Sequence, residues 1–180
     1  MKQASRAVET HPFGSFVPRN ARFLLLGSFT GKRSEEDILN GYDWFYGTKR
    51  NQFWPIMEAA LAVDLKTKAQ KQTLFEKLGM AITDIILSCE RKHGSNLDVN
   101  LTNVVFNTDT ILDIFKKNAI RSVFFSSRFV EKLFKKEFKA FLESHPDIEL
   151  VTLPSPSPRY AAMSRAEKIA RYRLLLPKLR

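Results

Sequence analysis

The sequence predicts a single α/β domain built on a central, mainly parallel sheet of four strands. Short apolar runs alternate with segments of helical periodicity, and most of the runs end in polar turn residues. This alternation is typical of strand–helix units that bury a parallel sheet between helices. A length of 180 residues suits one domain with a substantial core, and a hydrophobic fraction of 44% argues against wholesale disorder.

The predicted strands are four short segments dominated by apolar residues, and they span residues 23–26, 80–87, 122–125 and 148–153. Three of them run into polar turns, at Gly27-Ser28, at Ser126-Ser127-Arg128 and at the Ser-Pro tract 154–158. Because ligands bind beyond the carboxyl ends of parallel strands, we expect these turns to meet at one rim of the sheet. Their backbone N–H groups suit a phosphate or the polar edge of a base.

Helices are predicted between the strands from the spacing of apolar residues and from capping residues. The first two helices span about 52–63 and 67–78. Three further helices are predicted, which begin at Thr108, directly after Ser127 and at Ser164. The last begins with a capping box, Ser164 to Glu167. Residues 1–10 are expected to be a polar, mobile lead-in, which leaves 11–180 as the single domain.

Charge and composition limit the classes of function. The chain carries 29 Lys and Arg against 19 Asp and Glu, a net charge of +10, and its pI is near 9.8. This balance favours an anionic partner, which could be nucleic acid, an anionic membrane surface or a phosphorylated metabolite. No apolar run approaches the roughly 18 residues of a membrane span, and no secretion signal is visible. The single cysteine, Cys89, excludes an internal disulfide, so we expect a reducing cytoplasmic or nucleoid setting.

Several familiar catalytic motifs are absent. The segment 27–32 has three residues between its glycines, and Arg33 follows its lysine, so it is not the nucleoside-triphosphate loop. The zinc nucleobase deaminase pattern is also missing, and we expect no metal or cofactor. Asp84 is the best-placed acid, near the end of a strand, where a structural hydrogen bond is an equal alternative. A basic, solvated helix face is predicted from the spacing of Lys132, Lys135, Lys136 and Lys139.

The most unusual stretch is 46–54, which reads Tyr-Gly-Thr-Lys-Arg-Asn-Gln-Phe-Trp. Asn51 stands immediately before a predicted helix, where asparagine is a good N-cap. Close to the rim, the same amide could instead hold a water molecule or bond to a base. Tyr46 could likewise be a core residue or a stacking platform, and the residues alone leave both alternatives open.

Four segments in combination resemble the uracil-DNA glycosylase superfamily. They are His11-Pro12-Phe13, LLLGSFTG at 24–31, YGTKRNQFWPI at 46–56 and LPSPSPRYA at 153–161. The likeness is greatest to the hypoxanthine (deoxyinosine)-DNA glycosylase branch, which Ser88-Cys89-Glu90-Arg91 also resembles. The mismatch-specific uracil/thymine glycosylases come next. The resemblance implies a three-layer α-β-α sandwich.

The resemblance also implies an activity. A monofunctional DNA glycosylase would flip a deaminated base, hypoxanthine or uracil, out of DNA and hydrolyse its N-glycosidic bond, the first step of base excision repair. The expected partner is DNA with a deaminated or mismatched base, and the expected state is a monomer. Two departures leave the preferred base open. Many superfamily members have Asp or Asn where this chain has Ser28, and relatives commonly read His-Pro at Thr48-Lys49.

Site residues carry over by position in the matched segments. Asn51 would position the water, and Ser28 would be the second catalytic residue. The base would be bound by Gly27, Phe29, Tyr46 and Phe53, with Tyr46 stacking on it. Contacts with the DNA would come from Lys49, Arg50, Ser127, Ser155, Ser157 and Arg159.

Two other classes of protein share the charge and the aromatic residues. A non-catalytic DNA-binding module would release no base from any damaged DNA. A doubly wound enzyme acting on a phosphorylated small molecule would bind DNA with little sensitivity to salt, whereas several phosphate contacts produce steep salt dependence.

Overall fold

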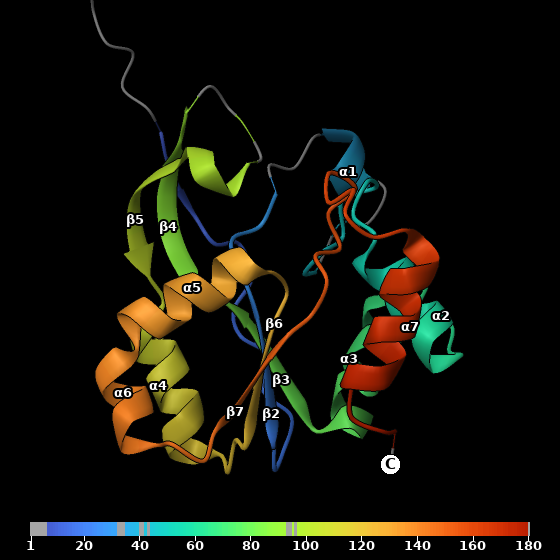
Figure 1. Cartoon of the computed structure of the whole chain (residues 1–180). Helices are drawn as coiled ribbons and strands as arrows, with labels where there is room; N and C mark the ends of the chain where they lie inside the picture. Colours follow the sequence, from blue (N-terminus) through green and yellow to red (C-terminus); the bar gives the residue numbers. More distant parts are fainter. Residues whose placement is uncertain are drawn as a thin grey trace, which may run out of the picture.

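The computed structural model describes residues 7–31, 35–39, 42, 44–92, 95 and 97–179. At its centre, four parallel strands lie in the order β3-β2-β6-β7, which confirms the predicted sheet (Figure 1). Three of these strands are buried along their whole length, as expected when both faces of a parallel sheet are covered. The strands are β2 (Phe23–Gly27), β3 (Met80–Asp84), β6 (Ser122–Phe125) and β7 (Glu149–Thr152).

Helices pack on both faces of this sheet and give three layers (Figure 1). On one face lie α2 (Phe53–Leu61), α3 (Lys68–Leu78) and α7 (Arg165–Leu175). The other face carries α4 (Thr108–Lys117), α5 (Arg128–Glu137) and α6 (Lys139–Ser144). Successive side chains of a strand point to opposite faces, so Phe23 and Leu25 join the first core while Leu24 and Leu26 join the second.

A second, antiparallel sheet in the order β1-β4-β5 was not predicted. The expected strand 80–87 breaks after β3, and the chain enters β4 in the other sheet. Its β5 forms in the segment before α4, for which no strand was predicted, and its β1 forms within the expected lead-in. Residues 1–6 of that lead-in lie outside the described part of the chain. The strands are β1 (Val8–Thr10), β4 (Ile86–Arg91) and β5 (Leu101–Phe106).

Local capping sets most helix boundaries close to their predicted positions. Capping boxes open α3, from Thr67 to Gln70, and α7, from Ser164 to Glu167. The segment after Ser127 forms two helices, α5 and α6, rather than the single expected helix. A five-residue helix, α1 (Glu35–Leu39), and a 3-10 turn, η2 (Asp98–Asn100), complete the elements used below. Within the described part of the chain, no helix has the length and apolar character that a bilayer crossing requires.

Candidate active site at the carboxyl ends of the strands

A cavity of about 470 Å³ opens beyond the carboxyl ends of the parallel strands. Its volume lies within the range of ligand pockets, roughly 300–1,000 Å³. A larger depression of about 670 Å³ lies at the opposite end of the sheet, where β6 and β7 begin, and its wall contains none of the predicted site residues. The rim position is where parallel α/β sheets bind ligands, so the smaller cavity is the candidate site.

Most of the predicted site residues meet at this cavity. They come from the loop after β2, the segment before α2, the start of α5 and the loop after β7, which are distant in sequence. The cavity wall includes Ser28, Phe29, Tyr46, Arg50, Asn51, Ser127, Ser155, Ser157 and Arg159. The expected convergence of the three polar turns is therefore observed.

Three predicted site residues lie elsewhere. Phe53 is fully buried behind Tyr46, with ring centroids 4.2 Å apart, so it supports the cavity wall and is not positioned to contact a base. Lys49 is exposed and pairs with Glu36 at 3.4 Å. Gly27 lies beneath the wall, where a Cβ would overlap the Asp84 carboxylate and come within 2.5 Å of the Tyr46 hydroxyl. Glycine is therefore required there by close approach.

Asn51 lies at the entrance to α2 and faces the cavity. Its side-chain oxygen accepts a hydrogen bond from the Phe53 N–H at 2.8 Å, and its own N–H donates to the Thr48 carbonyl at 2.9 Å. The N-cap of α2 is Gln52 and not Asn51 as expected, but the Asn51 side chain still supports the helix start from one residue earlier and also lines the cavity. The amide oxygen keeps a second lone pair, and its NH₂ group makes no hydrogen bond to the described residues.

Tyr46 is held in an unusual state. Its backbone has φ of +56°, in the left-handed region, and its ring stacks on Phe53. Its hydroxyl is buried and has no hydrogen-bond partner among the described residues. Burial, with a further contribution from the charge of Asp84, raises the pKa of Tyr46 well above its ordinary value. A buried hydroxyl without a partner is rare in native proteins, and at the wall of a cavity it indicates an atom that a ligand would satisfy.

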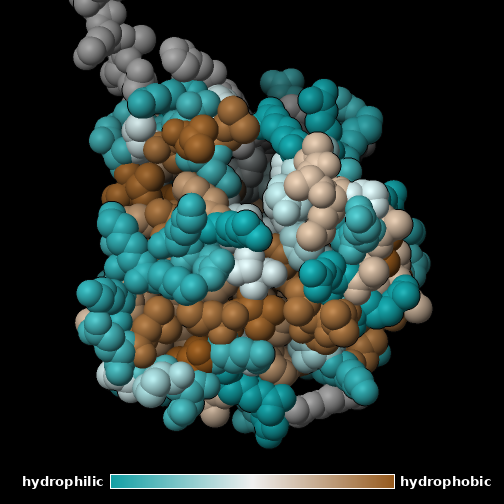
Figure 2. All heavy atoms as spheres, in the orientation of Figure 1, coloured by the Kyte–Doolittle hydropathy of each residue, from teal (hydrophilic) through white to brown (hydrophobic). Residues whose placement is uncertain are grey.

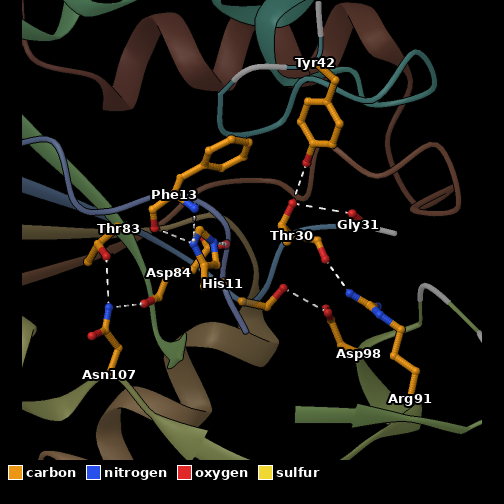
Figure 3. A network of polar contacts seen from close by, with 11 residues as sticks. His11, Phe13, Thr30, Gly31, Tyr42, Thr83, Asp84, Arg91, Asp98 and Asn107 are labelled. Carbon is orange, nitrogen blue, oxygen red and sulfur yellow. Dashed lines mark hydrogen bonds and ion pairs between the residues drawn. The ribbon is translucent and has the colours of Figure 1, made fainter. Parts of the chain in front are cut away.

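A buried ion pair supports the cavity beside Tyr46 (Figure 3). Asp84 ends β3, and its Oδ2 lies 2.7 Å from Nε2 of His11, with only 7% and 5% of the two side chains exposed. The other ring nitrogen of His11 lies 2.7 Å from the Phe13 carbonyl oxygen, so both nitrogens are engaged. Burial by itself lowers the pKa of His11, but the hydrogen bond and charge of Asp84 outweigh it and raise the pKa.

A second carboxyl group, Asp98, also faces the cavity. The Ser28 hydroxyl donates to its Oδ1 at 2.9 Å (Figure 3). Burial raises the pKa of Asp98 and outweighs the opposing effect of that hydrogen bond. Nearby, the buried Arg91 donates to the Thr30 carbonyl and lies 5.2 Å from the centre of the Phe29 ring, which fixes the loop after β2.

The loop after β7 is held from two helices. Tyr172 on α7 donates its hydroxyl to the Pro154 carbonyl at 3.0 Å, and Gln52 at the start of α2 donates its N–H to the Pro156 carbonyl at 3.1 Å. These bonds present the loop serines to the cavity. On the opposite wall, Ser127 both lines the cavity and accepts the Val130 N–H at 3.4 Å, as the N-cap of α5.

Comparisons with known proteins identify a solved structure with a similar fold. The sequence matches no family model and no curated protein. Among solved structures, the solution NMR structure of a proposed uracil DNA glycosylase from Methanosarcina acetivorans is similar, with a TM-score of 0.60 and 20% sequence identity. The similar region covers 94% of this chain and 99% of that one. The similarity confirms the three-layer α/β fold, and at this identity it shows the fold alone.

Sequence reasoning missed part of the acidic side of the cavity. His11 belongs to a segment that carried the resemblance, but no role was predicted for its side chain. The structural role left open for Asp84 is real, and the same carboxylate also faces the cavity. Asp98 carries no local signal, because its partner Ser28 lies 70 residues away.

Proposed function

We propose that this protein is a monofunctional DNA glycosylase that hydrolyses the N-glycosidic bond of a deaminated base, hypoxanthine or uracil, in DNA. Such an enzyme would act at the start of base excision repair and would need no metal or cofactor. The proposal rests on one observation above all. The rim cavity combines a loop amide, Asn51, with an aromatic wall and a buried tyrosine hydroxyl that makes no hydrogen bond of normal geometry within the described part of the chain, although Ser126 lies near it.

The cavity has the size and composition that an extruded base requires. Enzymes that act on a base in DNA take it out of the stack into a pocket, at a cost of a few kcal/mol. Aromatic contact replaces lost stacking and contributes roughly 1–3 kcal/mol per base. Phe29 and Phe45 supply that contact on the cavity wall, which leaves the Tyr46 hydroxyl for the edge of the base. The fold similarity to a proposed uracil DNA glycosylase supports the same activity.

Asn51 is the candidate for positioning the attacking water. As the C1′–N bond breaks, its electron pair leaves with the base, positive charge develops on the sugar, and the water oxygen forms the new bond to C1′. Such a transition state needs a placed water and fixed dipoles more than a strong nucleophile. The Asn51 amide is oriented by the Phe53 N–H, and its second lone pair can accept a hydrogen bond from the water, whose proton is finally taken up by the departing base or by bulk water.

The acidic side of the cavity fits the edge of a deaminated base. Deamination turns a ring nitrogen that accepts hydrogen bonds into a ring N–H beside a carbonyl. His11 occupies Oδ2 of Asp84, and the other carboxylate oxygen lies over Gly27 close to the Tyr46 hydroxyl. We assign this carboxylate oxygen as the acceptor for the ring N–H and the Tyr46 hydroxyl as the donor to the carbonyl. Hypoxanthine, uracil and xanthine all carry that pair of groups.

Cations and hydroxyls around the mouth would hold the DNA backbone. Arg50 and Arg159 lie on the cavity wall, together with the loop serines and the capped N-terminus of α5. Helix N-termini and serine hydroxyls are common phosphate contacts. Lys49 lies on the surface nearby, where its exposed pair with Glu36 contributes little and can be exchanged for a phosphate.

The direct test is base release. The protein is incubated with oligonucleotides that carry hypoxanthine, uracil, xanthine or a mismatched thymine, in single and double strands, and abasic sites are then cleaved with alkali. We expect release of at least one deaminated base. We also expect Asn51→Ala to lower single-turnover release by about 100-fold, which is the usual cost of one preorganised polar group. Binding of the same oligonucleotide should change little.

A neighbouring amide supplies the matched control. Gln52 is the N-cap residue of α2 but makes no side-chain capping bond, and it does not line the cavity. Gln52→Ala should therefore retain full activity. Salt-sensitive DNA binding without release of any base would overturn the enzyme proposal in favour of a binding module. Unchanged release by Asn51→Ala would remove Asn51 from the mechanism.

A further inference from the structure

A second cleft, of about 600 Å³, opens beside the candidate cavity and is continuous with it. The two share parts of their walls, namely Asp98, Ser127, Ser155, Ser157 and Arg159. The remaining wall comes from the start of α5, the end of β7 and the outer side of α7. The proposed bond cleavage takes place in the cavity and not in this cleft. A DNA strand whose extruded nucleotide enters the cavity must, however, continue along the protein surface beside it.

Three arginines from separate elements line the cleft. Arg128 comes from the start of α5, Arg159 from the loop after β7, and Arg171 from α7. All three are exposed, and none forms an ion pair with another described residue. Asp98 is the acidic residue in this wall, and its carboxyl group already accepts a hydrogen bond from Ser28. The cleft therefore presents three guanidinium groups that form no ion pair within the described part of the chain.

Several lysines of α4, α5 and α6 differ from these arginines, because they form ion pairs. Lys117 pairs with Asp113 at 2.7 Å, Lys135 pairs with Glu131 at 2.6 Å, and both pairs are spaced as successive turns of a helix. The outward side of α5 is accordingly a mixed hydrophilic surface (Figure 2). Charge paired in this way gives less attraction for a polyanion, so these lysines should contribute less than the unpaired arginines of the cleft.

A buried lysine supports the loop between the two openings. Lys168 on α7 is only 2% exposed, and burial lowers its pKa. Its ammonium group donates to the Ser157 carbonyl at 3.3 Å and lies 5.2 Å from the centre of the Tyr160 ring. Burying an ammonium group is costly unless it is hydrogen-bonded, so this contact ties the loop to α7 and fixes the ring at the cleft wall.

The cleft thus combines cations with an aromatic ring and apolar side chains, including Tyr160, Phe129 and Met163. A basic groove with rings for stacking is the usual arrangement for an unpaired nucleic acid strand. We propose that the cleft binds the unpaired DNA strand that continues on one side of the extruded nucleotide, with the arginines on its phosphates.

This inference rests on the proposed function, because it takes the neighbouring cavity as the site of the base. It makes the substrate a single-stranded or locally opened segment. It also makes the footprint asymmetric, since only one side of the extruded nucleotide lies in the arginine cleft. Nucleotides on that side should contribute to affinity, and nucleotides on the other side should contribute much less.

The experiment measures binding by fluorescence anisotropy, with single-stranded oligonucleotides carrying one central hypoxanthine. The strand is shortened by three nucleotides from the 5′ side or from the 3′ side. Shortening on one side should weaken binding about tenfold, and shortening on the other should have little effect. The double variant Arg128→Gln/Arg171→Gln should lose this asymmetry. Each phosphate contact contributes about 0.7 to the slope of log affinity against log salt concentration. Because the double variant removes two such contacts, its slope should be shallower by about 1.4.

The controls separate a cleft effect from a loss of charge or of fold. Lys136→Gln/Lys139→Gln removes the same charge from helices away from the cleft, and it should leave both asymmetry and salt slope unchanged. Arg128→Lys/Arg171→Lys keeps the charge and should keep most of the slope, which excludes unfolding as the cause of a loss. Equal losses on shortening either side, or an unchanged slope in the glutamine double variant, would overturn the inference.

The same measurements distinguish this inference from the proposed function. The salt slope on an undamaged single strand reports on the cleft without any base release. If no deaminated base is released but the slope still depends on Arg128 and Arg171, the enzyme proposal fails and the strand-binding cleft stands. If a base is released but the asymmetry and slope are insensitive to these arginines, the enzyme proposal stands and the cleft inference fails.

Discussion

The candidate cavity has two walls of different construction. The amide wall, formed by Asn51, Ser155 and Ser157, lies on loops whose side chains are partly exposed and are held by bonds to backbone groups. The acid wall is formed by Asp84, which is buried, and Asp98, which is half-buried, and both are bonded to side chains from distant parts of the sequence. The amide wall can therefore be altered with little cost to the fold, whereas the acid wall is part of the fold.

This difference predicts how function and stability separate. Substitution in the amide wall should change chemistry at nearly constant stability. Substitution in the acid wall should change both, because a buried group that loses its partner destabilises the native state. The four predictions below test that contrast, beginning with the change that should cost the most.

Asp84→Ala should cause the largest loss. It leaves His11 buried beside three aromatic rings without its acidic partner. Removing one member of a buried pair typically costs 3–5 kcal/mol, so we expect a fall of about 3 kcal/mol in the free energy of unfolding, measured in urea. Asp84→Asn keeps an acceptor for the ring and should lose less. Equal stability of Asp84→Ala and the wild type would show that the acid wall is not coupled to the fold.

The same pair should make stability depend on pH. The pKa of His11 is raised in the folded protein above 6.5, its value in the unfolded chain. Its contribution to stability is therefore complete below pH 6.5 and is lost as pH rises through the folded pKa. Urea unfolding from pH 5.5 to 9 should show a decrease in the free energy of unfolding over that window. His11→Gln should reduce this decrease in the free energy of unfolding. If the variant shows the same decrease as the wild type, other titrating groups cause it.

The sequence predicted the parallel sheet because its strands are continuous apolar runs, which only a doubly covered sheet can bury. It did not predict the break after Asp84, because tertiary contacts cause it. The Ile85 N–H donates to the Gly27 carbonyl at 2.9 Å, and the Asn107 N–H donates to the Ile85 carbonyl at 2.8 Å. Both partners come from other strands or loops, so no local pattern around residue 85 contains them.

The two walls differ in the same way in how well they were predicted. The amide wall lies within two short segments of the sequence, so residues such as Asn51 and Ser155 could be proposed from their own neighbours. The acid wall joins His11 to Asp84 across 73 residues and Ser28 to Asp98 across 70. Side-chain hydrogen bonds over such sequence distances form only in the folded chain, and the periodicity of hydrophobic residues does not predict them.

Asn51→Ala should have a smaller effect on stability than any change that leaves an acid-wall partner unpaired. The substitution removes the acceptor of the Phe53 N–H at the start of α2, which is worth about 1 kcal/mol. Asn51→Ser retains a short acceptor and should recover part of that stability without recovering base release. Urea unfolding and single-turnover release are measured on the same preparations. A loss above 3 kcal/mol for the alanine variant would contradict the assignment of Asn51 to a replaceable wall.

Tyr46→Phe should have the smallest effect on the free protein. The hydroxyl it removes is buried and makes no hydrogen bond to the described residues, so its loss should leave the free energy of unfolding unchanged or raise it by up to about 1 kcal/mol. The stacking on Phe53 is retained. Affinity for a hypoxanthine-containing strand should nevertheless fall, because the base loses its donor, while affinity for an undamaged strand should not. A stability loss above 1 kcal/mol together with unchanged discrimination would show that the hydroxyl serves the fold and not a ligand.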